Sequence, residues 1–153
     1  MRIGRIVLFL LVSLPVSGAA LPISNASAAA STTVVIAGQA TGFLPAPCNC
    51  PVPVYVAAQA SGSATSLEGA GTNHATTGVT NEFKLSGATA GSTVTLSGSV
   101  YRSTAAYLIG SGVAIDADST TGAFTFTLGP ITGGPFAGQT FVFVGSGTVL
   151  ILD

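Results

Sequence analysis

The chain has 153 residues, of which 48% are hydrophobic and only 6% are charged, and its formal net charge at pH 7 is −1. Globular domains usually carry about 25% charged residues, so the surface must be built mainly from Ser, Thr, Asn, Gln and Gly. Disordered segments combine low hydrophobicity with high charge. The reverse composition found here excludes an intrinsically disordered protein.

The first thirty residues have the three regions of a secretory signal in the required order. A short basic start is followed by an apolar run over residues 6–16 and by small residues over 26–30, whose small-x-small spacing suits signal peptidase. The apolar run is shorter than the roughly 20 residues that cross a bilayer, which disfavours a retained anchor helix. We predict a secretory signal peptide over residues 1–28 and a secreted or cell-envelope protein with the mature chain 29–153.

Loss of Arg2 and Arg5 with the signal takes the net charge to −3 and leaves Lys84 and Arg102 as the only basic residues. Two cations cannot neutralise a run of phosphates. The charge therefore excludes nucleic acid and anionic membrane surfaces as partners. The mature chain has the usual length of a single domain.

No helical stripe follows the signal. Apolar residues alternate with polar ones or form short runs, and Gly or Pro interrupts them within about ten residues, which is typical of a sandwich or a small barrel. We predict an all-β domain, a single antiparallel β-sandwich of immunoglobulin-like or jelly-roll-like type with about eight or nine short strands. The expected strands are residues 32–37, 52–58, 64–68, 80–85, 92–101, 105–116, 123–128, 140–144 and 148–152.

The clearest hairpin spans residues 113–128, where two apolar stretches flank a Ser-Thr-Thr-Gly turn. In the strand over residues 80–85, alternation directs Phe83 and Leu85 inward and Glu82 and Lys84 outward.

Residues 43–53 contain four prolines, which hold the backbone extended and cannot donate to a sheet ladder. We predict a stiff connector that crosses one end of the sandwich and separates the first strand from the rest of the domain. A strand isolated in this way, residues 31–39, could pair with the edge of a neighbouring molecule.

The last stretch, residues 148–152, is apolar without alternation. Such a run is typical of a strand covered on both faces. We expect it to lie inside the sandwich and to pair with residues 140–144 through a turn at 145–147.

Cys48 and Cys50 form the most unusual local motif. Two thiols this close should not stay free in an oxidising compartment. Three alternatives stay open: a tight internal disulfide, bridges between chains, and metal or redox chemistry. A zinc site is disfavoured, because His74 is the only histidine and such sites need four ligands.

Asp116 and Asp118 would share one face of a strand beside a turn. Together with turn carbonyls they could bind calcium, although that ion needs about six or more oxygen ligands. The alternative is a pair of solvated carboxylates that begin a turn. Neighbours on one strand cannot flank a sugar bond, which excludes a glycosidase pair.

No catalytic motif is present around the single histidine. His74 lies in a Gly-rich stretch without a Gly-x-Ser-x-Gly elbow. Tyr55, Tyr101 and Tyr107 could form a platform for a sugar or serve in packing.

The sequence therefore favours an exported, non-catalytic structural or interaction module at the cell surface, which associates with itself or with other proteins, in its sharpest form by strand exchange. No cofactor is expected. The alternatives are a secreted module that binds a small ligand or glycan, and a hydrolase whose site is not recognisable.

Overall fold

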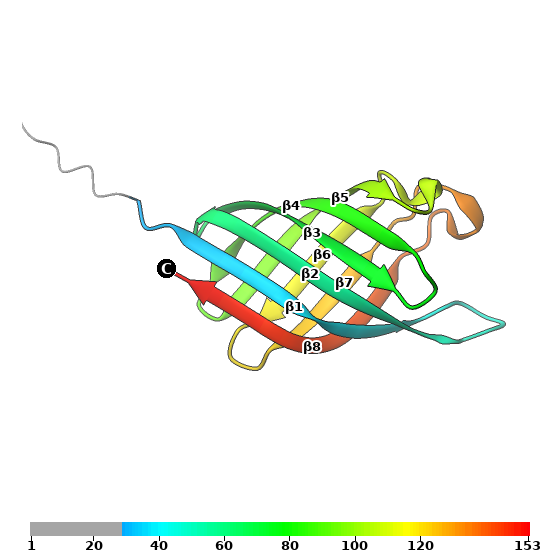
Figure 1. Cartoon of the computed structure of the whole chain (residues 1–153), viewed down its shortest axis with the longest axis horizontal. Coiled ribbons are helices and arrows are strands. Elements are labelled where there is room, and N and C mark those ends of the chain that lie inside the picture. The colour runs from blue at the N-terminus through cyan, green and yellow to red at the C-terminus, as the bar shows by residue number, and fades with distance from the viewer. Residues whose placement is uncertain (1–28) are drawn as a thin grey trace, which may run out of the picture.

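The structure is a computed structural model that describes residues 29–153, and the expected signal peptide, residues 1–28, lies outside them. Eight antiparallel strands form a closed barrel in which each strand pairs with the next and the last pairs with the first (Figure 1). No helix among residues 29–153 is long and apolar enough to cross a membrane. The elements are β1 (Thr32–Phe43), β2 (Pro51–Ser63), β3 (Ser66–Ala75), β4 (Thr80–Ala90), β5 (Thr93–Ser103), the 3₁₀ helix η1 (Ala106–Leu108), β6 (Gly112–Asp118), β7 (Ala123–Leu128), the 3₁₀ helix η2 (Gly134–Phe136) and β8 (Phe141–Leu152).

The prediction of an all-β antiparallel fold is confirmed, but the prediction of an open sandwich is wrong. β8 pairs with β1 from Thr33 opposite Leu152 to Thr41 opposite Val144, so the first and last strands close the sheet on itself. The alternation of apolar and polar residues could not reveal this closure, because strands of a sandwich and of a barrel both bury one face.

The C-terminal stretch differs from its prediction in two ways. Residues 140–144 and 148–152 are not two strands joined by a turn, because β8 runs without interruption through residues 145–147. The end of the chain is also not buried on both faces. Val149 points into the barrel and is 5% exposed, whereas Leu150 lies on the outside and is 44% exposed.

Glycines where β1 and β8 meet explain why residues 145–147 belong to a strand and not to a turn. The ring of Phe124 fills the barrel against β1 and β8, and a Cβ atom on Gly38 would lie 2.7 Å from that ring and 2.9 Å from the Cα atom of Gly147. Small residues beside large rings let a narrow barrel pack without voids. These glycines therefore serve packing and do not mark turns.

Three phenylalanine rings fill the middle of the barrel. The ring centroid of Phe126 lies 5.7 Å from those of both Phe83 and Phe143. As expected, Phe83 and Leu85 are buried while Lys84 is exposed. At this level the barrel is a packed body and not a channel.

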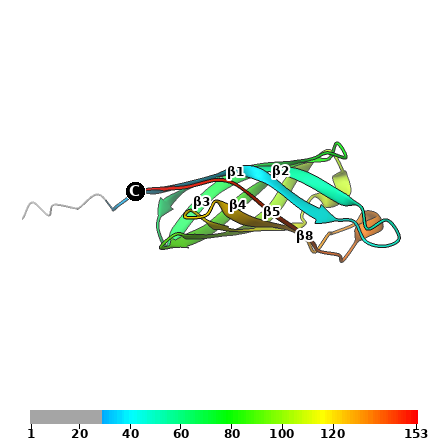
Figure 2. The same ribbon diagram turned by 90° about the horizontal axis from the view of Figure 1, so that it is seen from below.

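The two ends of the barrel differ. At one end tight turns join the strands and the two ends of the described chain meet, where the Thr32 hydroxyl donates to Asp153 Oδ1 at 2.8 Å. At the other end lie longer connections, residues 44–50, 104–111 and 129–140, and the first of them projects beyond the rest (Figures 1 and 2). Functional residues are concentrated on such connections.

Residues 43–53 do not connect the first strand to a separate body. They form the distal part of the β1–β2 hairpin, in which Pro51 and Pro53 belong to β2 and lie opposite Phe43 and Thr41. β1 is paired with β2 along one edge and with β8 along the other. The strand expected to be free for exchange is therefore already paired within its own chain.

Candidate functional site

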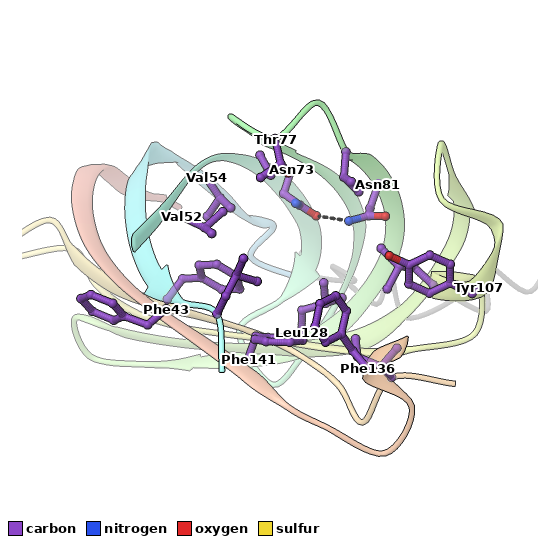
Figure 3. A pocket seen from close by; sticks show the side chains of 16 residues that line it. Phe43, Val52, Val54, Asn73, Thr77, Asn81, Tyr107, Leu128, Phe136 and Phe141 are labelled. Atoms are coloured by element: carbon purple, nitrogen blue, oxygen red, sulfur yellow. Dashed lines mark hydrogen bonds between the residues drawn. The ribbon is translucent and has the colours of Figure 1, made fainter. Parts of the chain in front are cut away.

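A cavity opens at the end of the barrel that carries the longer connections (Figure 3). Its volume is about 110 Å³, close to that of an engineered cavity of roughly 150 Å³ that binds benzene. The β1–β2 hairpin, the β3–β4 turn, η1 and the segment between β7 and β8 all contribute to its wall. Every connection at this end of the barrel therefore takes part in the site.

Aromatic side chains form much of the cavity wall. They are Phe43, Tyr107, Phe136, Phe141 and Phe143, and the rings of Phe136 and Phe141 pack edge to face with their centroids 5.4 Å apart. Such rings provide a large and rigid apolar surface. None of the 16 residues that line the cavity in the described part of the chain carries a charge. The wall therefore suits a neutral, mainly apolar molecule.

Hydrogen bonds between two connections hold the wall on the side of η1. The Thr132 hydroxyl lies 2.9 Å from the carbonyl oxygens of both Tyr107 and Ile109. The Thr132 N–H donates to Ser111 Oγ at 3.1 Å. Gly134 lies against the Tyr107 ring, where a Cβ atom would come within 2.6 Å of the ring carbon Cγ. These contacts fix the backbone that places Tyr107 at the cavity.

One polar pair lies among the apolar side chains of the cavity (Figure 3). Asn73 on β3 is 2% exposed and Asn81 on β4 is 1% exposed, and Asn81 Nδ2 donates to Asn73 Oδ1 at 3.1 Å. Behind them, the Ser103 hydroxyl donates to Asn81 Oδ1, and Ser103 Oγ accepts the Ala105 N–H at 3.0 Å. The cavity thus combines an apolar wall with one buried hydrogen-bonding group.

Sequence reasoning missed this pair, although its position carried a signal. Asn81 has the same place in the strand alternation as Phe83 and Leu85, and Asn73 has the same place as Leu67. A polar residue on the inner face of a strand needs a hydrogen-bond partner there. Two such residues on neighbouring strands indicate a paired internal site.

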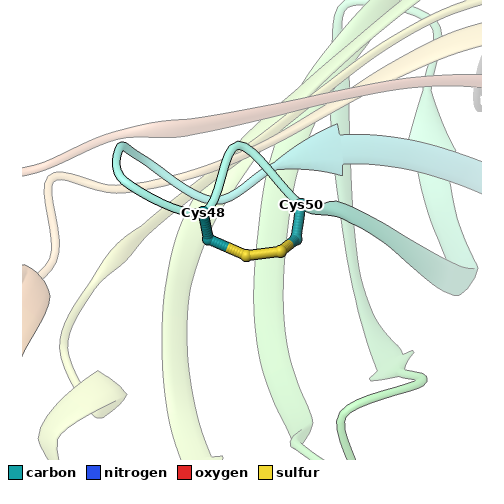
Figure 4. The surroundings of a disulfide bond; sticks show 2 residues. All are labelled: Cys48 and Cys50. Carbon is teal, nitrogen blue, oxygen red and sulfur yellow. A yellow bond between two sulfur atoms is a disulfide. The ribbon is translucent and has the colours of Figure 1, made fainter.

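Cys48 and Cys50 are joined by a disulfide bond within the chain, at the tip of the β1–β2 hairpin (Figure 4). Asn49 between them has a φ of 47°, a left-handed conformation in which Asn is enriched. The Cα atoms lie 5.0 Å apart, within the usual range for a disulfide. Of the three alternatives, the structure contains the internal bridge, and it lies outside the cavity lining.

We expect the double substitution Cys48→Ser and Cys50→Ser to lower the free energy of unfolding by less than ~2 kcal/mol, because the bridge closes a very short loop and restrains the unfolded chain little. Urea titration of mature protein would measure this loss. A loss of several kcal/mol would show that the hairpin tip is central to the fold.

Asp116 and Asp118 share the outer face of β6, as expected from their spacing. The described residues contain no group of three or more His, Cys, Asp or Glu side chains placed to hold a metal ion, so the pair gains no third acidic ligand there. Asp118 instead begins the turn to β7. Its Oδ1 accepts the Thr120 N–H at 2.8 Å, and this hydrogen bond to the charged form lowers the pKa of the carboxyl group.

The lowered pKa of Asp118 predicts a loss of stability in acid. Because the folded-state pKa lies below the unfolded one, the contribution is present above the unfolded pKa and disappears as the pH falls through the folded pKa. Asp118→Asn should therefore flatten the dependence of stability on pH below about pH 4. An NMR titration of the Asp118 carboxyl carbon with a midpoint at or above the ordinary value of 3.8 would contradict this account.

The single histidine and two of the tyrosines lie away from the cavity. His74 is on the outer face of β3, with Nδ1 2.8 Å from the Thr80 hydroxyl. Tyr55 lies on β2, and Tyr101 lies on β5 with its hydroxyl donating to Glu82 at 3.1 Å. β3 and β4 separate those two tyrosines, so the three expected tyrosines do not form one platform.

We compared the chain with protein-family models, with curated proteins and with solved structures, and none of the three comparisons finds a match. The fold and the cavity therefore carry the functional argument.

Proposed function

We propose that this protein is an exported, non-catalytic binding module that takes a small, neutral, mainly apolar molecule at the open end of its barrel. The cavity carries this proposal, because it is concave, rich in aromatic side chains and lined by no charged residue among those described. Eight-stranded barrels are wide enough to hold one small ligand. Ligand sites are typically apolar cavities with a few placed polar groups. The basic, apolar and small-residue pattern of residues 1–30 supports export.

The placement of the reactive residues supports binding over catalysis. Acid–base catalysis needs a titratable group within hydrogen-bond reach of the reacting atoms. The only histidine of the chain, His74, lies outside the barrel, and the cavity lining contains no carboxylate, lysine or cysteine among the described residues. Apart from the Tyr107 hydroxyl, the described lining therefore offers a bound molecule no titratable group, which favours binding over catalysis.

Filling the cavity tests the proposal. Ala75 lines the cavity at the end of β3, and Ala75→Leu would occupy much of the space open to a ligand. We expect the substitution to raise the Kd for toluene at least ~10-fold, a loss of about 1.4 kcal/mol of binding energy. Titration calorimetry with mature protein measures this.

Ala70→Leu is the matched control, because Ala70 is an exposed residue of the same strand. It should leave toluene binding unchanged. The proposal fails if the wild-type protein does not bind toluene or related small aromatics, or if both variants bind them as the wild type does.

Association with other copies or proteins is a second candidate function, supported by one observation. The outer face of β8 exposes Val142, Val144, Leu150 and Leu152, with exposed fractions between 44% and 65%. Apolar patches on a surface of low charge favour association. Sedimentation of mature protein should then show oligomers that Leu150→Lys disperses, and a monomer at all concentrations would exclude this candidate.

A further inference from the structure

The hydrogen bonds behind the cavity have a fixed direction. Ser103 Oγ accepts the Ala105 N–H, which leaves the Ser103 hydroxyl proton free to donate to Asn81 Oδ1. With its oxygen engaged in this way, Asn81 turns Nδ2 toward Asn73. Asn73 must meet that donor with Oδ1, because two amide NH₂ groups cannot bond to each other. In this orientation the Ser103 hydroxyl proton and the Asn81 NδH₂ group each have an amide oxygen as acceptor.

This direction leaves the amide nitrogen of Asn73 available to the cavity. An Asn side chain has two N–H donors on Nδ2, and among the described residues no hydrogen bond uses those of Asn73. Among the described residues, every side-chain nitrogen or oxygen atom that solvent cannot reach has a hydrogen-bond partner. Asn73 Nδ2 must therefore be reached from the cavity that its residue lines.

We propose that Asn73 Nδ2 is the polar anchor of this cavity and donates a hydrogen bond to the carbonyl oxygen of a small, neutral, mainly apolar ligand. This inference rests on the proposed function and names the chemical class of its ligand. A ligand carbonyl would satisfy this donor when the ligand takes the place of water in the cavity.

The surroundings of Asn73 select a carbonyl over other polar groups. A carboxylate would bring a charge into a lining without any basic residue among those described, and burial of an unpaired charge is strongly unfavourable. A hydroxyl group would need an acceptor for its own proton as well, whereas a carbonyl oxygen needs only the donor that Asn73 Nδ2 offers. A neutral acceptor suits Asn73 Nδ2 best, because it brings neither a charge nor a further donor into the cavity.

Two ligands of the same shape test the anchor. Acetophenone carries a carbonyl group where α-methylstyrene carries a methylene group, so the two differ only in the ability to accept a hydrogen bond. The measured quantity is the ratio of the Kd for α-methylstyrene to the Kd for acetophenone. Comparing this ratio between variants cancels the different hydration of the two ligands.

The informative variant is the double substitution Asn73→Leu and Asn81→Leu, because replacing both partners by apolar groups of similar size leaves no amide of the pair unpaired. We expect the ratio to fall by ~3–10-fold relative to the wild type, the equivalent of one ordinary hydrogen bond. Thr72→Val is the matched control, since Thr72 is the exposed neighbour of Asn73 on β3 and faces away from the cavity. It should leave the ratio unchanged.

A measurement on the wild-type protein covers the case in which the double variant does not fold. The side-chain NδH₂ protons of Asn73 should shift downfield in the NMR spectrum with acetophenone and not with α-methylstyrene. An unchanged ratio in the folded double variant, or equal proton shifts with both ligands, would overturn the anchor and leave the proposed function standing. Failure of the wild type to bind either ligand would instead overturn the proposed function.

Discussion

Removal of residues 148–153 should abolish cooperative unfolding. These residues pair with β1 from Thr33 opposite Leu152 to Ala37 opposite Thr148 and close the barrel. Without them, one edge of β1 loses its backbone hydrogen bonds to β8 over these residues. The inner side chains Val34 and Ile36, which are 0% and 1% exposed, would then be open to solvent. Because domains are stable by only about 5–15 kcal/mol, opening the barrel here should leave no folded state. Circular dichroism during urea titration should then show no sigmoidal transition.

A matched variant separates closure of the barrel from loss of apolar residues. Leu150 and Leu152 point outward, so changing both to Ser keeps the strand and should alter stability by less than about 1 kcal/mol. The account is wrong if the truncated chain unfolds cooperatively with the wild-type slope against denaturant, because that slope reports the surface exposed on unfolding. The end of β8 would then be peripheral to the fold.

Local alternation predicted part of this fold well. The strand expected over residues 123–128 is β7, and the hairpin expected over residues 113–128 is the pair β6–β7 with its turn between them. The inward direction of Phe83 and Leu85 was also predicted. These features depend on a few neighbouring residues, and alternation together with turn composition determines them.

Closure of the barrel was not predictable in the same way, because it depends on pairing between residues more than one hundred positions apart, such as Thr33 and Leu152. Two local signals also pointed in the wrong direction. Gly145 and Gly147 of β8 have the composition of a turn, but they lie against the backbone of β1, where a Cβ atom would not fit. The prolines of residues 43–53 suggested a connector, but two of them lie within β2.

The candidate site shows the same limit. The sequence drew attention to exposed or chemically unusual residues, among them Cys48, His74 and Asp116, and none of these lines the cavity. The residues that do line it come from four separate connections and from the strands beside them, which only the closed barrel brings together. Asn73 and Asn81 were the accessible clue, because each interrupts an apolar series on the inner face of its strand.

Phe126→Ala should cost about 3–5 kcal/mol of stability, the usual range for removing a buried phenylalanine ring. Phe126 is 0% exposed and its ring lies between those of Phe83 and Phe143, with both centroid distances at 5.7 Å. Removing it takes away its own burial and one contact surface of each neighbour. The strands around the space left by the ring are hydrogen-bonded on both sides and cannot move inward to fill it. The loss of stability should therefore be near the upper end of that range.

Urea titration of Phe126→Ala measures this loss, with Thr127→Ala as the control. Thr127 is the next residue of β7 and points outward, so its truncation should change the free energy of unfolding by no more than about 0.5 kcal/mol. A loss below about 1 kcal/mol for Phe126→Ala would mean that the interior can collapse around the missing ring. The barrel interior would then rearrange easily, and the cavity lined by Phe143 could not be treated as a preformed site.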